Sequence, residues 1–353
     1  MILIYFYLMV RLSYGLCKFS NERQFQNSIL KIHNDYDTPL QFNITDNYAR
    51  FFALGDWGGI PIFPYRTIVQ QNVALFMHNV SKNMNVHFQL GLGDNFYFDG
   101  VKSVDDKRFK LSFEDVFLDQ EIPWFFILGN HDYLGNPHAQ IEYTERSKRW
   151  ILPNYNYSIS VNINQGKNKL IYILMIDTVL LSQETEFRDR SNKVKTLNVT
   201  DHKKNDYFQE IEETLKKISL EKYPYVIVAG HYPVWSVSEH GPTKILVDKL
   251  RPLLHKYKVN AYFAGHEHDM EHLSHTYMNS TVEYIITGIA NLPYYSTEHL
   301  NDVPKDSLKY YWADIFQIHG ALALVEADLN AMNITYIKTN GEKLYQIKIK
   351  NKF

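Results

Sequence analysis

Five short blocks of the sequence each combine a glycine with side chains that can bind a metal ion. They are GDWGG at 55–59, GDNFY at 93–97, GNHDY at 129–133, GHYP at 230–233 and GHEH at 265–268. Seven of their side chains offer carboxylate, phenol, amide or imidazole donors: Asp56, Asp94, Tyr97, Asn130, His231, His266 and His268. This oxygen- and nitrogen-rich set, which has no thiolate, suits Fe(III), Zn(II) or Mn(II) and is poor for Cu(I) or iron–sulfur clusters.

The number of donors indicates two metal ions. Seven ligands exceed what one tetrahedral zinc needs, whereas two ions that share a bridging carboxylate would use them all. Paired ions roughly 3.5–4 Å apart stabilise both the entering and the leaving oxygen of an in-line displacement at phosphorus. Any one block alone is more often a turn or a helix cap, so the prediction depends on finding five of them in one chain.

The composition excludes several other functions. The 353 residues carry 37 basic and 39 acidic side chains, so no chain-wide cationic field attracts nucleic acid. Cys17 is the only cysteine, which rules out an intrachain disulfide and any cysteine-based metal site. With 45% hydrophobic residues, the chain can bury a large core.

Short apolar runs place the five blocks at the ends of strands. Continuous hydrophobicity predicts strands buried on both faces at 49–54, 86–92, 124–128, 170–176, 225–229, 259–264 and 282–287. Apolar residues at helical spacing predict helices over 67–83, 207–219 and 243–257, and residues 320–349 read as three strands joined by tight turns, which finish a sheet antiparallel. The alternation indicates an α/β fold, in which ligands bind beyond the carboxyl ends of the strands.

The N-terminus points to the secretory pathway. Residues 2–10 form a nine-residue apolar run that is too short to span a bilayer and matches the hydrophobic region of a signal peptide, with cleavage expected after Gly15. An uncleaved anchor or an ordinary first strand are the alternatives. We expect residues 1–15 to be a signal peptide, 16–46 a polar leader and 47–353 a single catalytic domain, in a monomer without an integral membrane span after signal cleavage. The protein would be secreted or held in an acidic vesicle or vacuole, and six Asn-x-Ser/Thr triplets support this only weakly.

In this order, the blocks GDWGG, GDNFYF, GNHD, VAGHYPVWS and AGHEH resemble the purple acid phosphatases of the metallophosphoesterase superfamily, in particular the small animal-type, tartrate-resistant enzymes. The resemblance covers roughly residues 48–349, and the tyrosine of GDNFY separates purple phosphatases from relatives without it. It implies a four-layer α-β-β-α sandwich of two mixed sheets with helices outside, the calcineurin-like metallophosphoesterase fold. By the same resemblance Asp56, Tyr97 and His268 would bind Fe(III), Asp94 would bridge, and Asn130, His231 and His266 would bind Fe(II) or Zn(II).

The resemblance also implies an activity. The substrates would be small phosphate monoesters or phosphoproteins, hydrolysed under acidic conditions by in-line attack of a metal-bound hydroxide. His131 and His240 match histidines that hold the phosphate and transfer protons, and either could protonate the leaving group.

One loop departs from the mammalian pattern. Mammalian relatives carry a cysteine pair that this chain lacks, so the polar segment 182–200 must be held by packing alone. It matches the place of the mammalian repression loop, which implies activation by a protease cut, with an acidic residue such as Glu184, Glu186 or Asp189 facing the site.

Two other functions compete with this prediction. A dinuclear Mn or Zn phosphodiesterase or protein phosphatase of the same superfamily would need no iron, and Tyr97 argues against it. A secreted binding protein on an inactive phosphatase scaffold would have lost metal ligands, yet all seven positions are filled.

Overall fold

A computed structural model describes residues 22–32, 38–119, 121–188, 193–198, 207–314, 316 and 318–351. The predicted signal peptide at 1–15 and Cys17 lie outside the described residues. Among the helices of the described part, none is both long enough and apolar enough to cross a membrane.

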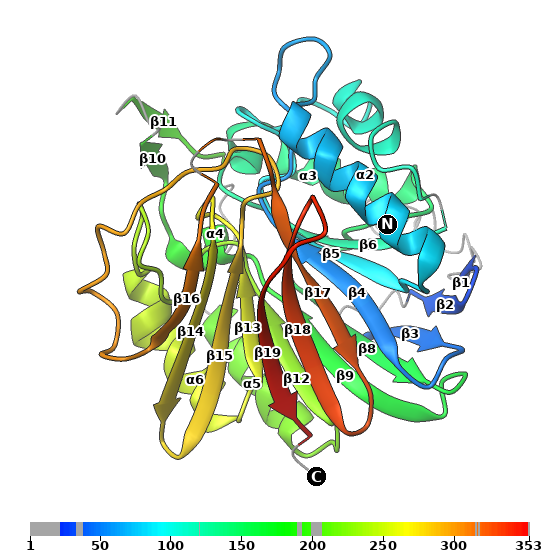
Figure 1. The fold of residues 1–353 in the computed structure, drawn as a ribbon, viewed down its shortest axis with the longest axis vertical. Coiled ribbons are helices and arrows are strands. Elements are labelled where there is room, and N and C mark those ends of the chain that lie inside the picture. The colour runs from blue at the N-terminus through cyan, green and yellow to red at the C-terminus, as the bar shows by residue number, and fades with distance from the viewer. Residues whose placement is uncertain are drawn as a thin grey trace, which may run out of the picture.

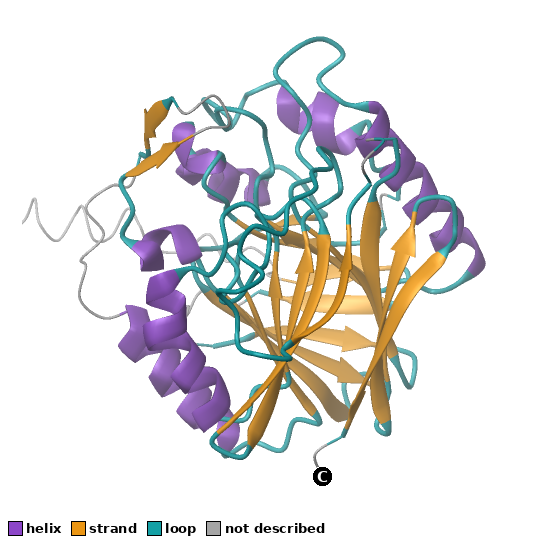
Figure 2. Ribbon diagram, turned by 60° about the vertical axis from the view of Figure 1, so that its left-hand side comes forward, coloured by secondary structure: helices purple, strands orange, loops and turns teal. Residues whose placement is uncertain are grey.

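Two mixed sheets form the centre of the molecule, and helices cover their outer faces (Figures 1 and 2). The larger sheet has ten strands, in the spatial order β1 (Glu22–Phe25), β2 (Ser28–Lys31), β3 (Leu40–Ile44), β8 (Tyr157–Ile163), β9 (Asn168–Met175), β12 (Tyr225–Ala229), β13 (Ala261–Ala264), β15 (Ser280–Thr287), β14 (Met270–Tyr277) and β16 (Leu308–Trp312). The other has seven, in the order β19 (Lys343–Lys350), β18 (Ala331–Lys338), β17 (Ala321–Ala327), β4 (Ala49–Leu54), β5 (Phe88–Leu92), β6 (Trp124–Ile127) and β7 (Trp150–Ile151). The expected architecture of two mixed sheets with helices outside is confirmed.

Parallel strands lie at the middle of both sheets. In the smaller sheet β4, β5 and β6 run parallel, and in the larger sheet β9, β12, β13 and β15 do so. Their residues are almost all buried, as the continuous apolar runs predict. The three C-terminal strands β17, β18 and β19 pair antiparallel, also as predicted, and β17 adds them to β4.

The helices follow the predicted periodicity with one exception. Helix α2 (Ile68–Asn83) begins after Thr67, whose side chain accepts a hydrogen bond from the Gln70 amide at 3.1 Å, and α5 (Tyr207–Ser219) has the predicted bounds. The exception lies in the helix predicted at 243–257, which runs from 244 to 256 but contains a π-helical turn, η4 (Leu246–Leu250), that leads directly into α6 (Arg251–Lys256). Pro252 explains the irregular turn, because it has no amide proton for the regular helical hydrogen bond.

The shorter elements surround the loops at the carboxyl ends of the strands. They are η1 (Phe109–Glu114), η2 (Asp132–Leu134), α3 (Pro137–Glu142), η3 (Tyr143–Glu145), α4 (Thr178–Ser182), β10 (Glu186–Arg188) and β11 (Val194–Thr196).

The N-terminal segment corrects one expectation. Within the expected leader at 16–46, the described residues 22–32 and 38–46 belong to the fold, because β1, β2 and β3 extend the larger sheet and β3 pairs with β8. Phe42 on β3 is fully buried, and its ring lies 5.4 Å from Phe88 and 5.6 Å from Phe125 in edge-to-face contacts. The sequence LQFNI alternates apolar and polar residues, which suits a strand with one buried face but looks polar on average. We propose that a single catalytic domain includes these three strands.

Buried His255 on α6 yields a prediction about stability and pH. Its Nδ1 donates to the Ser280 carbonyl at 2.9 Å, its Nε2 lies 3.2 Å from the Tyr284 hydroxyl, and burial lowers its pKa to about 4. Between this value and the usual pKa the unfolded chain binds a proton that the folded chain does not, so His255 lowers stability as the pH falls from 6.5 to 4. His255→Asn can still donate to Ser280, but its side chain takes up no proton in this pH range. The variant is therefore expected to reduce the loss of folding stability in acid by on the order of 2 kcal/mol. Urea unfolding of both proteins at pH 7 and pH 4.5 measures the difference, and equal pH dependence would contradict the prediction.

Candidate metal centre

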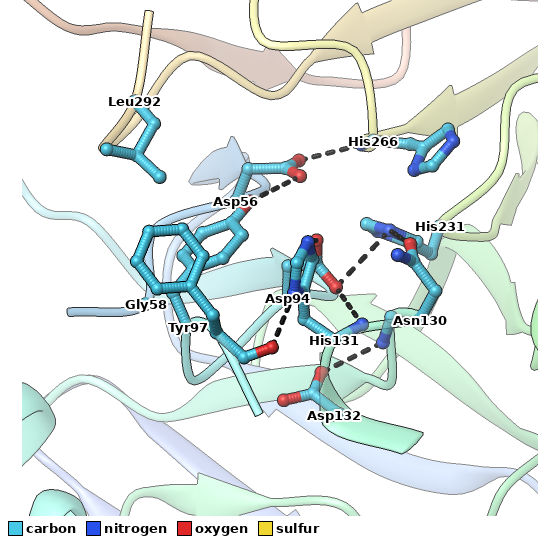
Figure 3. Close-up of polar contacts among 12 residues, drawn as sticks. Asp56, Gly58, Asp94, Tyr97, Asn130, His131, Asp132, His231, His266 and Leu292 are labelled. Atoms are coloured by element: carbon cyan, nitrogen blue, oxygen red, sulfur yellow. Dashed lines mark hydrogen bonds and ion pairs between the residues drawn. The ribbon is translucent and has the colours of Figure 1, made fainter. Parts of the chain in front are cut away.

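Four of the five blocks directly follow β4, β5, β12 and β13, and the block at 129–133 begins two residues after the end of β6. Side chains from all five blocks come together in one cluster (Figure 3). One group of donors gathers around the Tyr97 hydroxyl. This oxygen lies 2.9 Å from Asp56 Oδ1 and 2.9 Å from His268 Nε2, and the last two atoms are 3.4 Å apart. Donors that bind one metal ion at about 2.0–2.2 Å are separated by about 3 Å when they lie at right angles. The three atoms therefore fit one ion.

A second group lies beside the first. Asn130 Oδ1 is 3.0 Å from His231 Nε2, which in turn is 3.5 Å from Asp94 Oδ1. The His266 ring lies next to this group, with its centroid 5.1 Å from that of His231.

Asp94 connects the two groups. Asp56, Asp94 and His231 each offer a ligand atom within 4.8 Å of the other two. In Figure 3, Asp94 lies between Asp56 on one side and Asn130 with His231 on the other. The structure thus brings all seven sequence-predicted side chains together at one place.

Backbone carbonyls fix which nitrogen of two histidines faces the site. His231 Nδ1 lies 2.8 Å from the Leu92 carbonyl, and His268 Nδ1 lies 2.5 Å from the Leu292 carbonyl. Because a carbonyl can only accept a hydrogen bond, both Nδ1 atoms carry a proton, and each ring turns its Nε2 toward the cluster. Metal-binding histidines are commonly held by such a second hydrogen bond.

Several acceptor atoms face one another inside the cluster. His231 Nε2 faces the Asn130 side-chain oxygen and the Asp94 carboxylate, and both of these oxygens are acceptors. Unpaired acceptors at this depth are costly unless a cation lies between them. The donor chemistry therefore fits bound metal ions.

The two carboxylates respond differently to burial. Burial raises the pKa of Asp56 well above its usual value. Burial also acts to raise the pKa of Asp94, but the imidazoles of His231 and His131 outweigh it and hold this pKa below its usual value. Asp94 is thus the more readily ionised carboxylate, as a group shared by two cations should be.

The backbone is strained at three ligand positions. Asp56, Asp94 and His266 have φ angles of 56°, 50° and 71°, in the left-handed region that residues other than glycine rarely adopt. Such strain persists where surrounding structure enforces it, and it concentrates at functional sites. These residues make the sharp turns themselves, and Gly93, which precedes Asp94, also has a positive φ of 88°.

Two further histidines line the cavity of about 270 Å³ above the donors. His131 Nδ1 donates to the Phe98 carbonyl at 2.6 Å, and its Nε2 lies 3.9 Å from Asp94 Oδ2. His240 Nδ1 lies 3.2 Å from Glu267 Oε2, while its ring packs 4.2 Å from that of His266. Both histidines therefore line the same cavity as the candidate donors Asp94, Tyr97 and Asn130.

Comparisons with known proteins agree with this geometry. The family model for calcineurin-like phosphoesterases matches residues 49–270. The chain is 38% identical over 332 residues to tartrate-resistant acid phosphatase type 5 of Oryctolagus cuniculus, covering 91% of this chain and 96% of the relative. The chain belongs to the purple acid phosphatases.

Two other relatives extend the comparison. Purple acid phosphatase 4 of Arabidopsis thaliana is 32% identical, with 69% of this chain and 68% of the relative covered. The solved structure of GAP50, described as the anchor in the inner membrane complex of Plasmodium, superposes with a TM-score of 0.70 at 24% identity and covers 87% of this chain and 90% of its own. That likeness concerns the fold. Membership of the purple acid phosphatases makes the chain an acid phosphatase of the metal-dependent phosphoesterase type.

The described residues of the segment 182–200, which are 182–188 and 193–198, lie at the edge of this phosphatase site and include two paired strands. Strands β10 and β11 pair antiparallel, and Asn198 binds the Tyr133 and Gly135 carbonyls through its amide and its side chain, each at 2.7 Å. The residues that it presents to the metal cavity are aromatic and cationic: Phe187, Arg188 and Lys195.

The acidic residues that the sequence analysis placed toward the site lie differently. Glu184 and Glu186 line a neighbouring cavity of about 730 Å³, which also touches His240. Burial raises the pKa of Glu184, while the Tyr232 hydroxyl and His240 act against it. Asp189 lies outside the described residues.

Sequence reasoning missed two residues that shape the purple phosphatase site. Asp132 accepts hydrogen bonds from the amides of Asn95 at 3.1 Å, Phe96 at 3.2 Å and Gly129 at 2.9 Å, which ties the second block to the third. Thr178 Oγ1 accepts from the amide of His231 at 3.1 Å. Asp132 belongs to the same GNHDY block as Asn130, and this position could have pointed to its role. The residue type and position of Thr178 do not point to its contact with His231.

Proposed function

We propose that this protein hydrolyses phosphate monoesters under acidic conditions at a centre that holds Fe(III) and a divalent ion, Fe(II) or Zn(II). The observation that carries the proposal is the convergence of seven buried or half-buried side chains whose oxygen and nitrogen atoms lie close to one another at one place. Asp56, Tyr97 and His268 would hold the ferric ion, and Tyr97 as tyrosinate would give the purple colour. Asn130, His231 and His266 would hold the divalent ion, with Asp94 shared by both.

Two such ions, when bound, would neutralise the charge of a phosphate group and lower the pKa of nearby water, so that hydroxide is available in acid. The chain's own task is to hold the ester so that attack occurs in line with the leaving oxygen. His131, fixed by the Phe98 carbonyl, would hold the phosphate from one side of the cavity.

His240 is the better placed proton donor. The Glu267 carboxylate accepts from the His240 backbone amide at 3.0 Å and lies 3.2 Å from Nδ1, contacts that hold the imidazole beside the cavity. In acid, the other ring nitrogen would carry a proton for the leaving oxygen.

A direct test is hydrolysis of a chromogenic monoester and the matching diester at pH 5 and pH 7, before and after removal of metal with a chelator. The proposal predicts monoester hydrolysis that is faster at pH 5, is lost with the metal and returns with iron. Preferred hydrolysis of the diester, or full recovery with Mn(II) alone, would favour the non-iron alternative.

We also propose that entry into the secretory pathway through residues 1–15 brings the protein to an acidic compartment or to the cell exterior, where it acts as a monomer. A protease cut within 182–200 would then widen access to the cavity, because the hairpin residues Phe187 and Arg188 line both cavities beside His240. Limited proteolysis should raise turnover, and unchanged turnover after complete cleavage would refute this role.

A further inference from the structure

The loop between β4 and α2 carries an exposed apolar tip, which we define as residues 61–65 with the sequence PIFPY. In this tip the side chains of Ile62 and Phe63 are 67% and 82% exposed. The loop projects at the top of the molecule (Figures 1 and 2) and directly follows the block at 55–59 that supplies Asp56. The apolar tip therefore lies at the same end of the sheets as the metal centre.

Hydrogen bonds at the base of the loop hold the apolar tip out from the protein. Ser112 Oγ donates to the Tyr65 carbonyl at 2.6 Å, and the side chain of Asn291 donates to the Gly58 carbonyl. The Tyr65 amide donates back to the Ile62 carbonyl at 2.7 Å, which closes a turn inside the tip. A loop that is already held in this way loses little further freedom when it meets a partner.

The backbone of the apolar tip suits contact with lipid. An amide proton that leaves water must find an acceptor, and hydrocarbon offers none. Pro61 and Pro64 have no amide proton, and the Tyr65 amide already donates to the Ile62 carbonyl. Three of the five tip positions therefore bring no unpaired backbone donor to a lipid surface.

A second exposed segment extends the apolar surface along α2. Asn72 Nδ2 donates to the Ile318 carbonyl at 3.3 Å, and the exposed side chain of Ile68 lies one turn earlier on the same face of the helix. Phe316 is exposed as well. The Asp314 carboxylate accepts from the amides of Phe316 and Ile318 at 3.1 and 3.0 Å, which fixes this turn. Exposed apolar side chains gathered from separate segments mark contacts with proteins or membranes.

The charges around the apolar tip favour an anionic lipid surface. Residues 57–93 include no aspartate or glutamate, although 39 of the 353 residues of the chain are acidic. Arg66 directly follows the tip, and Nζ of the exposed Lys107 lies 4.5 Å from the centroid of the Tyr65 ring. Cations beside exposed aromatic and aliphatic side chains are typical of surfaces that bind membranes containing anionic lipid.

We propose that the apolar tip, with Ile68 beside it, docks on a membrane that contains anionic lipid. Ile62 and Phe63 enter the layer of head groups and upper acyl chains, while Arg66 and Lys107 contact lipid phosphate. This docking is separate from the reaction at the metal centre. It turns the end of the molecule that carries the metal centre toward the membrane.

Flotation of the full chain with lipid vesicles tests the proposal. The vesicles contain phosphatidylcholine alone or a roughly four-to-one mixture with phosphatidylserine. We expect wild type to bind the mixed vesicles more tightly. The double variant Ile62→Ser/Phe63→Ser is expected to bind them about tenfold or more less tightly, and Lys107→Gln about fivefold less tightly. Phe63→Trp, which keeps an aromatic ring suited to the membrane interface, is expected to bind at least as well as wild type.

Leu220→Ser is the matched control, because Leu220 is 83% exposed and lies before the amino end of β12, whereas the apolar tip follows the carboxyl end of β4. It should bind vesicles as wild type does, and thermal unfolding establishes that each variant is folded. All variants share one N-terminus, so the apolar run at 2–10 cannot produce a difference between them.

Two kinds of result would overturn the inference. The first is a wild-type protein that does not bind the mixed vesicles, or a double serine variant that binds them as wild type does. The second is evidence that another copy of the chain occupies this surface. Sedimentation without lipid would then show a dimer for wild type and a monomer for the double variant.

Discussion

Asp94→Asn is expected to lower kcat/KM for a phosphate monoester by roughly a thousandfold or more, a loss of about 4 kcal/mol of transition-state stabilisation. Asp94 Oδ1 lies 3.5 Å from His231 Nε2 and accepts from the His131 amide at 2.9 Å, while Oδ2 lies 3.9 Å from His131 Nε2. The amide has the same shape but no negative charge, and only one of its two terminal atoms can bind a cation. Steady-state kinetics with the protein loaded under identical metal concentrations measures the effect.

Asp105→Asn serves as the control for loss of a carboxylate. The Asp105 side chain is 78% exposed and makes only a long contact of 3.9 Å to Arg146. Its replacement should leave kcat/KM within about twofold, because exposed ion pairs contribute little. Activity retained in Asp94→Asn within about tenfold would show that this carboxylate is not shared by two metal ions.

The second large effect is expected from Gly129→Ala, which adds one methyl group behind the same carboxylate. A Cβ at this position would lie 2.2 Å from Asp94 Oδ1 and 2.4 Å from the Asp94 amide nitrogen, far inside van der Waals contact. Asp94 already sits in a strained backbone conformation, so it has little room to yield. We expect activity to fall by roughly a hundredfold or more, because a misplacement of about 1 Å at a reacting centre is costly.

Gly341→Ala separates this effect from the general cost of replacing a glycine. Gly341 lies in the turn between β18 and β19 with a φ of 90°, and an added Cβ would meet nothing within 4 Å. This control should lose about 1 kcal/mol of stability and no activity. Elemental analysis of both variants gives the decisive comparison, since a full metal complement and normal turnover in Gly129→Ala would contradict the packing argument.

Strands buried on both faces could be predicted from the sequence, and strands with polar faces could not. The run YVIVA at β12 is apolar throughout, and its position was evident. By contrast, β8 buries Ser160 and Asn162, which are satisfied by the Tyr223 hydroxyl at 2.7 Å and by Asn43 at 3.0 Å. A buried polar residue with a distant partner looks like a loop residue until the partner is known.

Strand β14 was missed for the same reason. Its sequence MEHLSHTY is polar, yet His272 is buried and lies 2.8 Å from Glu283 on the neighbouring strand β15. Cross-strand pairing of this kind arises only when the sheet is assembled.

The convergence of the candidate ligands could be predicted more fully than their geometry. Residue type and position after a strand predicted that Asp56, Asp94 and His231 lie together, because the carboxyl ends of parallel strands meet at one edge. The carbonyls that fix the imidazoles could not be foreseen, since Leu92 and Leu292 accept through their backbone and any residue could do so. The aromatic character of the 182–200 hairpin toward the cavity also depends on how it docks on Tyr133 and Gly135.

Metal content and the visible spectrum of the purified protein and of Tyr97→Phe test the central claim most directly. The Tyr97 hydroxyl lies 2.9 Å from both Asp56 and His268, so tyrosinate would be bound to the ferric ion. We predict two metal ions per chain, at least one of them iron, and a visible absorption band in the wild type that is absent from the variant. A wild-type protein that binds no iron when iron is supplied, or a band that survives unchanged in Tyr97→Phe, would contradict the account.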